Sequence, residues 1–372
     1  MDAQTFCMEL KTGIVLLLFA FFFLGCVQFN DPVPTPLPPT APASSPVASS
    51  IPMSSPPAVS SSPTVESSDF SGSWLYVLTG YDVFTGPDDP GLVKRIVDTP
   101  ADGLVVDAQK YARVWFTSRE VAAFKQNHAT VLGYVSIGEA EDYRDYWNPD
   151  WTQTPPAWMG RVNPQWEGNV KVKYWDPAWQ TIVMNYVGRI ARQGFDGAYL
   201  DIVDAYEYWS DEDNGEEAFS DASFSGRRNY LDRDEAAARM IAFLALIRQE
   251  GRTVNPDFKV FPQNAQQLVE YPGYLDAIDG IGREDTWYVD YDDRNAPGSV
   301  AVPSDASRLD YELEPLRKIK AAGKTVLVVD YFAPNQFGLA RDFRTRAEAE
   351  GFHLYPADTR KLDDVSSLFS AR

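Results

Sequence analysis

Eight short apolar segments alternate with helical segments along most of the chain, and this alternation limits the possible fold more than any other feature. The apolar segments occupy 74–80, 103–108, 131–141, 197–206, 258–266, 277–285, 325–332 and 352–358. Between them, apolar residues three and four positions apart predict helices over 118–127, 176–193, 233–250, 309–323 and 339–350. Asp176 and Pro177 are typical of a helix start, because Asp caps a first turn and Pro fits its first position.

This alternation predicts the α/β class. Strands that read as nearly continuous apolar runs are typical of parallel sheets covered on both faces. Eight such strands with intervening helices indicate a closed (β/α)₈ TIM barrel, which we place at residues 69–372. A doubly wound open sheet is the alternative fold, but no Gly-rich dinucleotide fingerprint follows the first strand.

The N-terminal residues carry a signal for export. Ile14–Leu24 is a run of eleven apolar residues, which is too short for a membrane span of about 20 residues and fits the core of a signal peptide. We therefore predict a signal peptide over 1–26. Gly25 and Cys26 follow the run as they do in bacterial lipoprotein signals, so Cys26 is a predicted lipidation site. Ordinary cleavage, with an unmodified cysteine, is the alternative.

Residues 27–68 are predicted to be a disordered linker. The stretch Asp31–Ser68 contains eleven Pro and eleven Ser and almost no large apolar side chain. Such a segment cannot bury enough surface to offset its chain entropy. A Pro-rich ligand for a partner protein is the alternative interpretation.

Charge and cysteine content exclude several classes of protein. The chain has 53 acidic and 33 basic residues, a formal charge of −20, whereas a nucleic-acid partner needs a basic face. Both cysteines, Cys7 and Cys26, precede the predicted domain, which excludes a disulfide scaffold, a thiolate zinc site and a cysteine nucleophile there. The two histidines, His128 and His353, lie before and inside strands, so a Ser-His-Asp hydrolase is not expected.

Polar side chains follow nearly every predicted strand, where barrel enzymes hold their catalytic groups. The candidates are Asp82, Asp107, Ser136, Glu139, Glu141, Asp201, Asp204, Asn264, Glu284, Asp330 and Tyr331. Paired carboxylates suit glycoside hydrolysis, because one carboxyl protonates the leaving oxygen and the other attacks the anomeric carbon or activates water. A divalent metal site is the alternative use of clustered carboxylates. We expect no metal and no cofactor.

Tryptophan content favours a sugar ligand over a metal-bound phosphate. Six of the ten Trp, at positions 147, 151, 158, 166, 175 and 179, fall between the third strand and the next helix. Indole rings stack on the apolar C–H faces of sugars, so we expect Trp166 and Trp175 to bind substrate while two or three of the six pack the loop. Arg144 and Tyr206 belong to the same predicted rim and are further substrate-binding candidates.

Four motifs, in this order, resemble glycoside hydrolase family 114, the endo-α-1,4-polygalactosaminidases. They are YVSIGEAEDYRDYW (134–147), GFDGAYLDIVDAY (194–206), FPQNAQ (261–266) and GREDTWY (282–288). The resemblance implies a TIM barrel that cleaves α-1,4-linked galactosaminogalactan, a partly deacetylated and therefore cationic polysaccharide. It implies that Asp201 is the nucleophile and Glu284 the general acid/base of a retaining mechanism.

The resemblance also implies roles around these two carboxylates. Asp204 would contact sugar hydroxyls or the substrate amine, and Asp107, Asn264, Asp330 and Tyr331 would orient Asp201 or bind the central sugar.

Residues 69–372 hold 49 acidic and 32 basic residues, a balance that suits a cationic polymer and solubility equally well. We expect an exported monomer, secreted or held at the cell surface only by a lipid. A non-catalytic carbohydrate-binding lipoprotein is the alternative.

Overall fold

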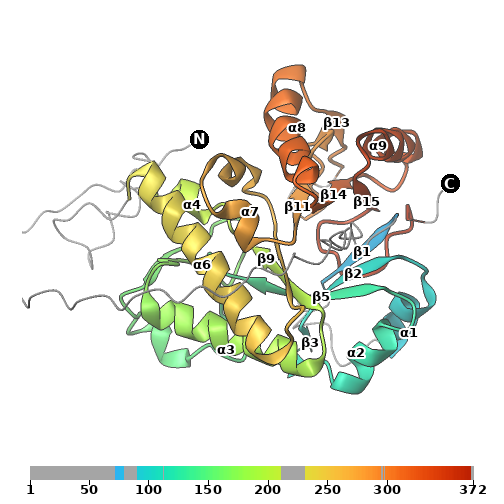
Figure 1. Ribbon diagram of the computed structural model, residues 1–372. Coiled ribbons are helices and arrows are strands. Elements are labelled where there is room, and N and C mark those ends of the chain that lie inside the picture. Colours follow the sequence, from blue (N-terminus) through green and yellow to red (C-terminus); the bar gives the residue numbers. More distant parts are fainter. Residues whose placement is uncertain are drawn as a thin grey trace, which may run out of the picture. The chain divides into compact units, whose positions relative to one another are not determined.

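The computed structural model describes residues 72–78, 90–111, 113–210, 231–294, 296 and 298–369. Contacts within the chain divide it into 1–63 and 64–372, and all the described residues belong to the second unit. The predicted signal peptide, Cys26, the predicted linker and Asp82 lie outside the described residues. In the second unit, strands lie in the interior and helices pack around them (Figure 1).

Each of the eight predicted strand segments contains one strand of a parallel sheet. A five-stranded sheet has the order β1 (Trp74–Val77), β2 (Gly103–Asp107), β5 (Thr130–Ser136), β9 (Gly197–Asp201) and β10 (Lys259–Pro262). A three-stranded sheet has the order β11 (Gly280–Glu284), β14 (Thr325–Tyr331) and β15 (His353–Ala357). Single parallel bridges link Gln263 to Gly282 and Ser73 to Leu354, at the two edges where the sheets meet. The predicted α/β class is confirmed.

Two of the predicted strands were wrong at their carboxyl ends. The segment 131–141 contains β5 and then a separate antiparallel strand, β6 (Glu139–Glu141). The segment 197–206 contains β9 and then the short helix α4 (Ala205–Tyr208). In both segments the chain turns directly after the last strand residue, so the strand ends earlier than the apolar pattern does.

The helices follow the strands in the predicted alternation. They are α1 (Pro90–Asp98), α2 (Ser118–Phe124), α3 (Pro177–Gln193), α6 (Arg233–Val254), α7 (Tyr274–Ala277), α8 (Ala306–Ala321) and α9 (Phe337–Glu350), with 3₁₀ helices η1 (Pro149–Thr152) and η3 (Gln266–Glu270). The Asp176 side chain accepts from the Ala178 backbone N–H and caps α3, as its sequence position predicts. Helices α3 and α6 pack side by side (Figure 1).

Short antiparallel strands, which the sequence pattern did not predict, lie in the loops after three of the parallel strands. They are β3 (Gln109–Tyr111) with β4 (Val114–Trp115), β6 with β8 (Asn169–Val172) and β7 (Met159–Val162), and β12 (Tyr288–Val289) with β13 (Val302–Pro303). Each is two to four residues long, which is too short for a period-two pattern to stand out. They give the loops a fixed backbone next to the strand ends.

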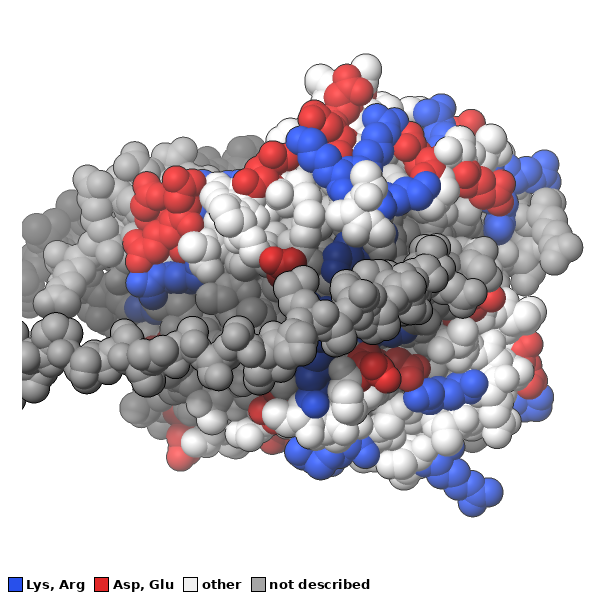
Figure 2. Space-filling model, viewed as in Figure 1, with Lys and Arg blue, Asp and Glu red and all other residues white. Residues whose placement is uncertain are grey.

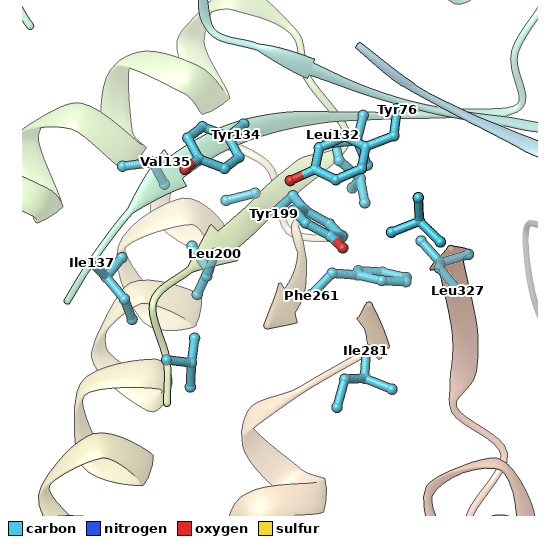
Figure 3. Packing of buried hydrophobic residues seen from close by; sticks show 14 of the residues in the cluster. Tyr76, Leu132, Tyr134, Val135, Ile137, Tyr199, Leu200, Phe261, Ile281 and Leu327 are labelled. Atoms are coloured by element: carbon cyan, nitrogen blue, oxygen red, sulfur yellow. The ribbon is translucent and has the colours of Figure 1, made fainter. Parts of the chain in front are cut away.

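Large aromatic side chains fill the space between the parallel strands. Trp74, Tyr76 and Tyr199 are in ring contact, with centroids 5.2 to 5.8 Å apart, and Figure 3 shows Tyr76, Tyr199 and Phe261 next to one another. A Cβ atom on Gly282 would lie 1.8 Å from the Tyr199 hydroxyl oxygen. Only glycine therefore fits at position 282 as long as Tyr199 keeps its place.

None of the described helices is both long enough and apolar enough to cross a membrane.

Candidate active site

Two carboxylates, each the last residue of a parallel strand, line one pocket. Asp201 ends β9 and Glu284 ends β11, and β10 lies in sequence between them. The pocket has a volume of about 110 Å³. Its lining residues are Tyr76, Leu78, Tyr134, Trp166, Asn169, Asp201, Ile202, Gln263, Asn264, Glu284, Tyr331, Arg360 and Leu362. The predicted catalytic pair therefore shares one cavity at the carboxyl ends of the strands.

Asp201 is held by two donors. The Tyr134 hydroxyl donates to Oδ2 over 2.5 Å, and the backbone N–H of Ile202 donates to Oδ1 over 2.8 Å. Burial raises the pKa of Asp201 well above its ordinary value, the negative charge of Glu284 raises it further, and the two donors lower it. Asp201 therefore holds a proton more tightly than a free aspartate does.

Glu284 is surrounded by neutral donors. The Tyr331 hydroxyl donates to Oε1, while the side-chain amides of Gln263 and Asn264 donate to Oε2, the latter over 3.3 Å. The Tyr76 hydroxyl donates to Gln263 Oε1 over 2.7 Å, so the same amide connects β1 to the pocket. Donors therefore point at both carboxylate oxygens of Glu284 and fix the position of this side chain in the pocket.

The backbone turns sharply after three of the strands that supply the pocket. Ile202, Asn264, Ala265 and Asp285 have φ between 52° and 59°, a left-handed conformation that costs energy in non-glycine residues and most of all in a β-branched one. A Cβ atom on Gly138 would lie 2.1 Å from the carbonyl oxygen of Ile202, so glycine at 138 leaves room for that turn. Strained backbone therefore gathers where the two carboxylates are presented.

Arg144 forms a buried ion cluster outside the pocket. Its Nε donates to Glu141 Oε2 and its Nη1 to Asp107 Oδ1, both over 2.6 Å, and each of the three side chains is at most 2% exposed. The guanidinium lies 5.8 Å from the ring centroid of Tyr134, which donates to Asp201. The cluster thus supports the wall that carries Tyr134, and none of its three members lines the cavity.

Glu139 is the centre of a second cluster. Its carboxylate accepts from the side chains of Asn163 and Asn169, both over 3.0 Å at the shortest, and from Lys171 over 3.2 Å. Asn169 lines the pocket, whereas Glu139 is buried behind it. Glu139 therefore touches the cavity wall through Asn169.

Asp330 and Ser136 are buried at strand ends and do not line the pocket. Asp330 accepts the backbone N–H groups of Thr286, Trp287 and Tyr288 over 2.7 to 3.0 Å, which holds the turn that follows β11. Burial raises the pKa of Asp330, these donors lower it, and the result is about 7. Ser136 Oγ has no hydrogen-bond partner among the described residues.

The tryptophans divide between the pocket and the loop. Trp166 lines the cavity, with the Arg294 guanidinium 3.6 Å from its ring centroid. The rings of Trp147, Trp151, Trp158 and Trp179 form a continuous chain of contacts with centroids 5.0 to 5.4 Å apart. Trp175 packs on Trp209. Most of the set therefore packs the loop, and Trp166 alone of the six is a pocket residue.

A smaller pocket of about 90 Å³ lies beside the first and shares Asn264 with it. Asp204 lines this second pocket, and burial together with the charge of Glu207 raises the pKa of Asp204 to about 6. The buried Tyr206 lines neither pocket, and its hydroxyl lies 3.0 Å from Glu207. Asp204 is thus next to the carboxylate pair without touching the same cavity.

Several pocket residues were absent from the sequence prediction. Gln263 follows β10 and belongs to the polar strand ends and to the motif FPQNAQ, but it was not among the predicted binding residues. Tyr76 and Tyr134 are aromatic residues inside strands and look like core. Arg360 lies after β15, with its guanidinium 4.2 Å from the ring centroid of Tyr331 and Nη2 2.5 Å from Asp285 Oδ1. The carbonyl of Leu362 accepts from the backbone N–H of Leu78, so this segment also closes the pocket toward β1.

Within the ranges that the structure describes, no group of three or more His, Cys, Asp or Glu side chains is arranged to hold a metal ion.

Comparison with known proteins identifies the family. A sequence model of glycoside hydrolase family GH114 matches residues 55–370. The chain belongs to family GH114. This GH114 protein is therefore a glycoside hydrolase, as the motif resemblance predicted, and the enzyme class is confirmed.

Two relatives with long matches come from distant organisms. A protein of Methanocaldococcus jannaschii is 33% identical, with 81% of this chain and 80% of the relative covered. A protein of Deinococcus radiodurans is also 33% identical, with 78% and 82% covered. Neither relative's name states an activity, so these matches indicate no substrate.

Two solved structures share the fold of this GH114 protein. The glycoside hydrolase domain of PelA from Pseudomonas aeruginosa has a TM-score of 0.56 at 18% identity, with 78% of this chain and 96% of that domain covered. Ega3 from Aspergillus fumigatus, solved in complex with galactosamine, has a TM-score of 0.52 at 15% identity, with 80% and 94% covered. At this identity the likeness concerns the fold alone.

Proposed function

We propose that this protein is an exported, endo-acting and retaining glycoside hydrolase that cleaves α-1,4-linked polysaccharides containing galactosamine. The observation that carries the proposal is the carboxylate pair, Asp201 and Glu284, at two strand ends in one pocket. The galactosamine bound in the Ega3 structure supports the substrate class. The family supplies glycoside hydrolysis, and the pair supplies the two groups that this reaction needs.

We also propose that the eight parallel strands form a closed (β/α)₈ barrel. The bridges between Gln263 and Gly282 and between Ser73 and Leu354 support closure, because they lie at both edges where the two sheets meet. In such a barrel the catalytic groups are expected at the carboxyl ends of the strands. Asp201 and Glu284 occupy these positions.

In the proposed reaction, Asp201 attacks the anomeric carbon while Glu284 gives its proton to the leaving oxygen. This step forms a glycosyl ester on Asp201 and breaks the glycosidic bond. Glu284, now ionised, takes a proton from water, whose oxygen attacks the anomeric carbon and releases Asp201. Each carboxyl group thus returns to its starting state.

The protein without substrate does not hold Asp201 in the form that attack requires. Burial and the charge of Glu284 raise the pKa of Asp201, whereas attack requires an ionised Asp201. A cationic sugar near Asp201 would lower the pKa of its carboxyl group, since a nearby positive charge favours the ionised form. Substrate binding would then prepare the nucleophile.

The first test uses the full-length chain and partly deacetylated α-1,4-galactosaminogalactan. Mass spectrometry should detect soluble oligosaccharides of several lengths from the wild type, and Asp201→Asn or Glu284→Gln should each reduce their release by about 1,000-fold or more. Proton NMR of fresh product should show the α-anomer first. A β-anomer would contradict retention, and monosaccharide alone would contradict endo cleavage.

Azide distinguishes the roles of the two carboxylates. Azide added to a nucleophile variant displaces the leaving group directly and yields a β-glycosyl azide, whereas azide added to an acid/base variant attacks the covalent intermediate and yields an α-glycosyl azide. We expect the β-product from Asp201→Gly and the α-product from Glu284→Gly. The reverse result would make Glu284 the nucleophile.

Binding of the polymer without release of any product would instead favour the non-catalytic carbohydrate-binding lipoprotein. Loss of activity on adding a chelator would favour the metal-dependent alternative.

Export and lipidation are tested in bacterial cells by labelling with a radioactive fatty acid. We expect label in the wild type and none in Cys26→Ser, and an unlabelled wild type would contradict the lipid anchor.

A further inference from the structure

The second pocket, which we call the Asp204 pocket, has a lining that the proposed reaction does not use. Its lining residues are Asp204, Glu207, Asn264, Ala265, Gln266, Gln267, Arg283, Tyr311 and Glu312. It shares Asn264 with the catalytic pocket, and Asp204 lies three residues after Asp201 in the chain. A polymer bound across Asp201 and Glu284 would therefore place a neighbouring unit in or beside the Asp204 pocket.

Most charged side chains of the Asp204 pocket already have partners of opposite charge. Arg283 donates to Glu312 over 2.7 Å, and its other terminal nitrogen donates to Asn264 over 2.9 Å. Glu207 is paired with Arg233 over 2.7 Å. By contrast, the Asp204 carboxylate makes no hydrogen bond or ion pair with any residue that the structure describes. It is the lining charge that remains available for a ligand.

Tyr311 provides an apolar surface at the same place. It lies on α8, lines the Asp204 pocket and is 57% exposed. An exposed aromatic ring beside a polar cavity has a face on which a sugar ring can stack. A carboxylate without a partner and an exposed aromatic face together provide what a sugar with a charged substituent requires: a counter-ion and a stacking surface.

We infer that the Asp204 pocket is a subsite for a sugar unit that carries a protonated amine, with Asp204 pairing with the ammonium group and Tyr311 stacking on the ring. The inference rests on the proposed function, because it assumes that a polymer crosses the catalytic pocket. It adds a location for substrate discrimination: the enzyme distinguishes a free amine from an N-acetyl group in the Asp204 pocket.

The test measures binding by calorimetry to the full-length Asp201→Asn protein, which does not consume its ligand. The probes are the α-1,4-linked galactosamine tetrasaccharide and the same tetrasaccharide fully N-acetylated. Adding Asp204→Asn should weaken binding of the galactosamine probe about tenfold or more, since a hydrogen bond to a charged group is lost. Binding of the acetylated probe should change less than twofold.

Two further variants separate a specific subsite from a general effect of charge. Glu207→Gln removes an equal charge from the same pocket, but Glu207 is committed to Arg233, so its effect on the galactosamine probe should be several times smaller than that of Asp204→Asn. Tyr311→Ala should weaken binding of both probes, and Tyr311→Phe should restore it. Because Tyr311 is mostly exposed, neither change should impair folding.

The outcomes separate this inference from the proposed function. Equal losses for both probes, equal effects of Asp204→Asn and Glu207→Gln, or no binding of either probe would overturn the subsite. Selective binding by the Asp201→Asn protein, combined with a wild type that cleaves no polymer, would overturn the proposed hydrolysis and leave the subsite standing. Cleavage by the wild type without selective binding would overturn the subsite and leave the proposed hydrolysis standing.

Discussion

Asp201 and Glu284 are both carboxylates, but different hydrogen-bond donors surround them. Asp201 has one side-chain donor, Tyr134, while Glu284 has three, Gln263, Asn264 and Tyr331. The sequence could indicate the two carboxylates, because strand ends are where barrel chemistry takes place. It also indicated the donors Asn264 and Tyr331 by their positions at strand ends. It could not indicate Tyr134, because a tyrosine inside a strand has the same pattern whether its hydroxyl meets a carboxylate or only the core.

The partly buried charge of Asp201 has a cost in stability that can be measured. The pKa of Asp201 is higher in the folded protein than in the unfolded chain, so the folded protein binds the proton more tightly. The free energy of unfolding therefore falls as pH rises from the unfolded pKa to the folded pKa, because Asp201 loses its proton over this range. Asp201→Asn should therefore raise the melting temperature at neutral and alkaline pH, and the gain should shrink as pH falls toward the ordinary pKa of aspartate. Asp98→Asn, at an exposed position, is the control. An unchanged melting temperature at pH 8 would refute this account.

The hydroxyl of Tyr134 should set the acidic limit of the reaction. Its hydrogen bond lowers the pKa of Asp201, so Tyr134→Phe should raise that pKa and move the acidic limb of the pH–rate profile to higher pH. On the acidic side the rate should fall about tenfold, the value of one hydrogen bond to a charged group. Tyr143→Phe, which removes a hydroxyl from Glu141 outside the pocket, should leave the limb in place. A uniform loss at every pH would indicate a structural role for Tyr134.

Arg144 should be needed for folding. Its removal leaves Asp107 and Glu141 as buried charges without a partner, a change that typically costs about 3–5 kcal/mol. We therefore expect Arg144→Met to lower the free energy of unfolding by this amount in denaturant titrations. Lys94→Met removes a cation from an exposed pair with Asp98 and should cost no more than about 1 kcal/mol. Similar losses for both variants would show that the buried cluster is not important for stability.

At the scale of the elements, burial determines what the sequence reveals. The eight parallel strands are covered on both faces, and each therefore stands out as an apolar run. Glu139 and Glu141 follow β5 much as Asp204 follows β9, but β6 pairs with β8 and carries both glutamates away from the cavity. Arg360 was not predicted, because the sequence pattern points to carboxylates and amides at strand ends and Arg360 is a cation in the segment after β15. The contacts that decide pocket membership join elements far apart in sequence.

Tyr199 of β9 packs closely against Gly282 of β11, and this contact gives a prediction at the scale of the elements. Gly282→Ala would place a Cβ atom 1.8 Å from the Tyr199 hydroxyl, so Tyr199 or the strand must move. Overpacking of this kind typically costs about 1–3 kcal/mol, and Glu284 lies two residues away, so both stability and turnover should fall. Gly338→Ala, in a helix where the added atom meets nothing within 4 Å, should not be destabilising. Equal stability of both variants would contradict the close packing seen here.

At the scale of the whole molecule, the charge is large in sum but mixed in distribution. The chain carries a formal charge of −20, yet Figure 2 shows acidic and basic side chains interspersed over the face in view. This arrangement suits solubility and gives that face no single sign. Attraction of a cationic polymer should therefore depend on carboxylates near the cleft more than on the total charge.

The salt dependence of KM should reveal the attraction between the cationic polymer and the enzyme. Raising the ionic strength screens charges that are exposed, so the KM for partly deacetylated polymer should increase several-fold between about 0.01 and 0.15 M salt. The KM for the fully acetylated polymer should stay nearly constant, because that polymer carries no amine charge. Parallel increases for the two polymers would mean that salt acts on the enzyme and not on the attraction.

The segment after β15 contributes Arg360 and Leu362 to the pocket, and Leu362 is bonded to Leu78 at the end of β1. The first and last parts of the domain must therefore meet before the cavity exists. During synthesis on a ribosome, every strand could pair with its neighbour while the enzyme remained inactive, because the wall near Tyr331 would still be missing. Contacts between such distant parts of a chain form slowly. Catalytic activity should accordingly be the last property that this domain acquires as it folds.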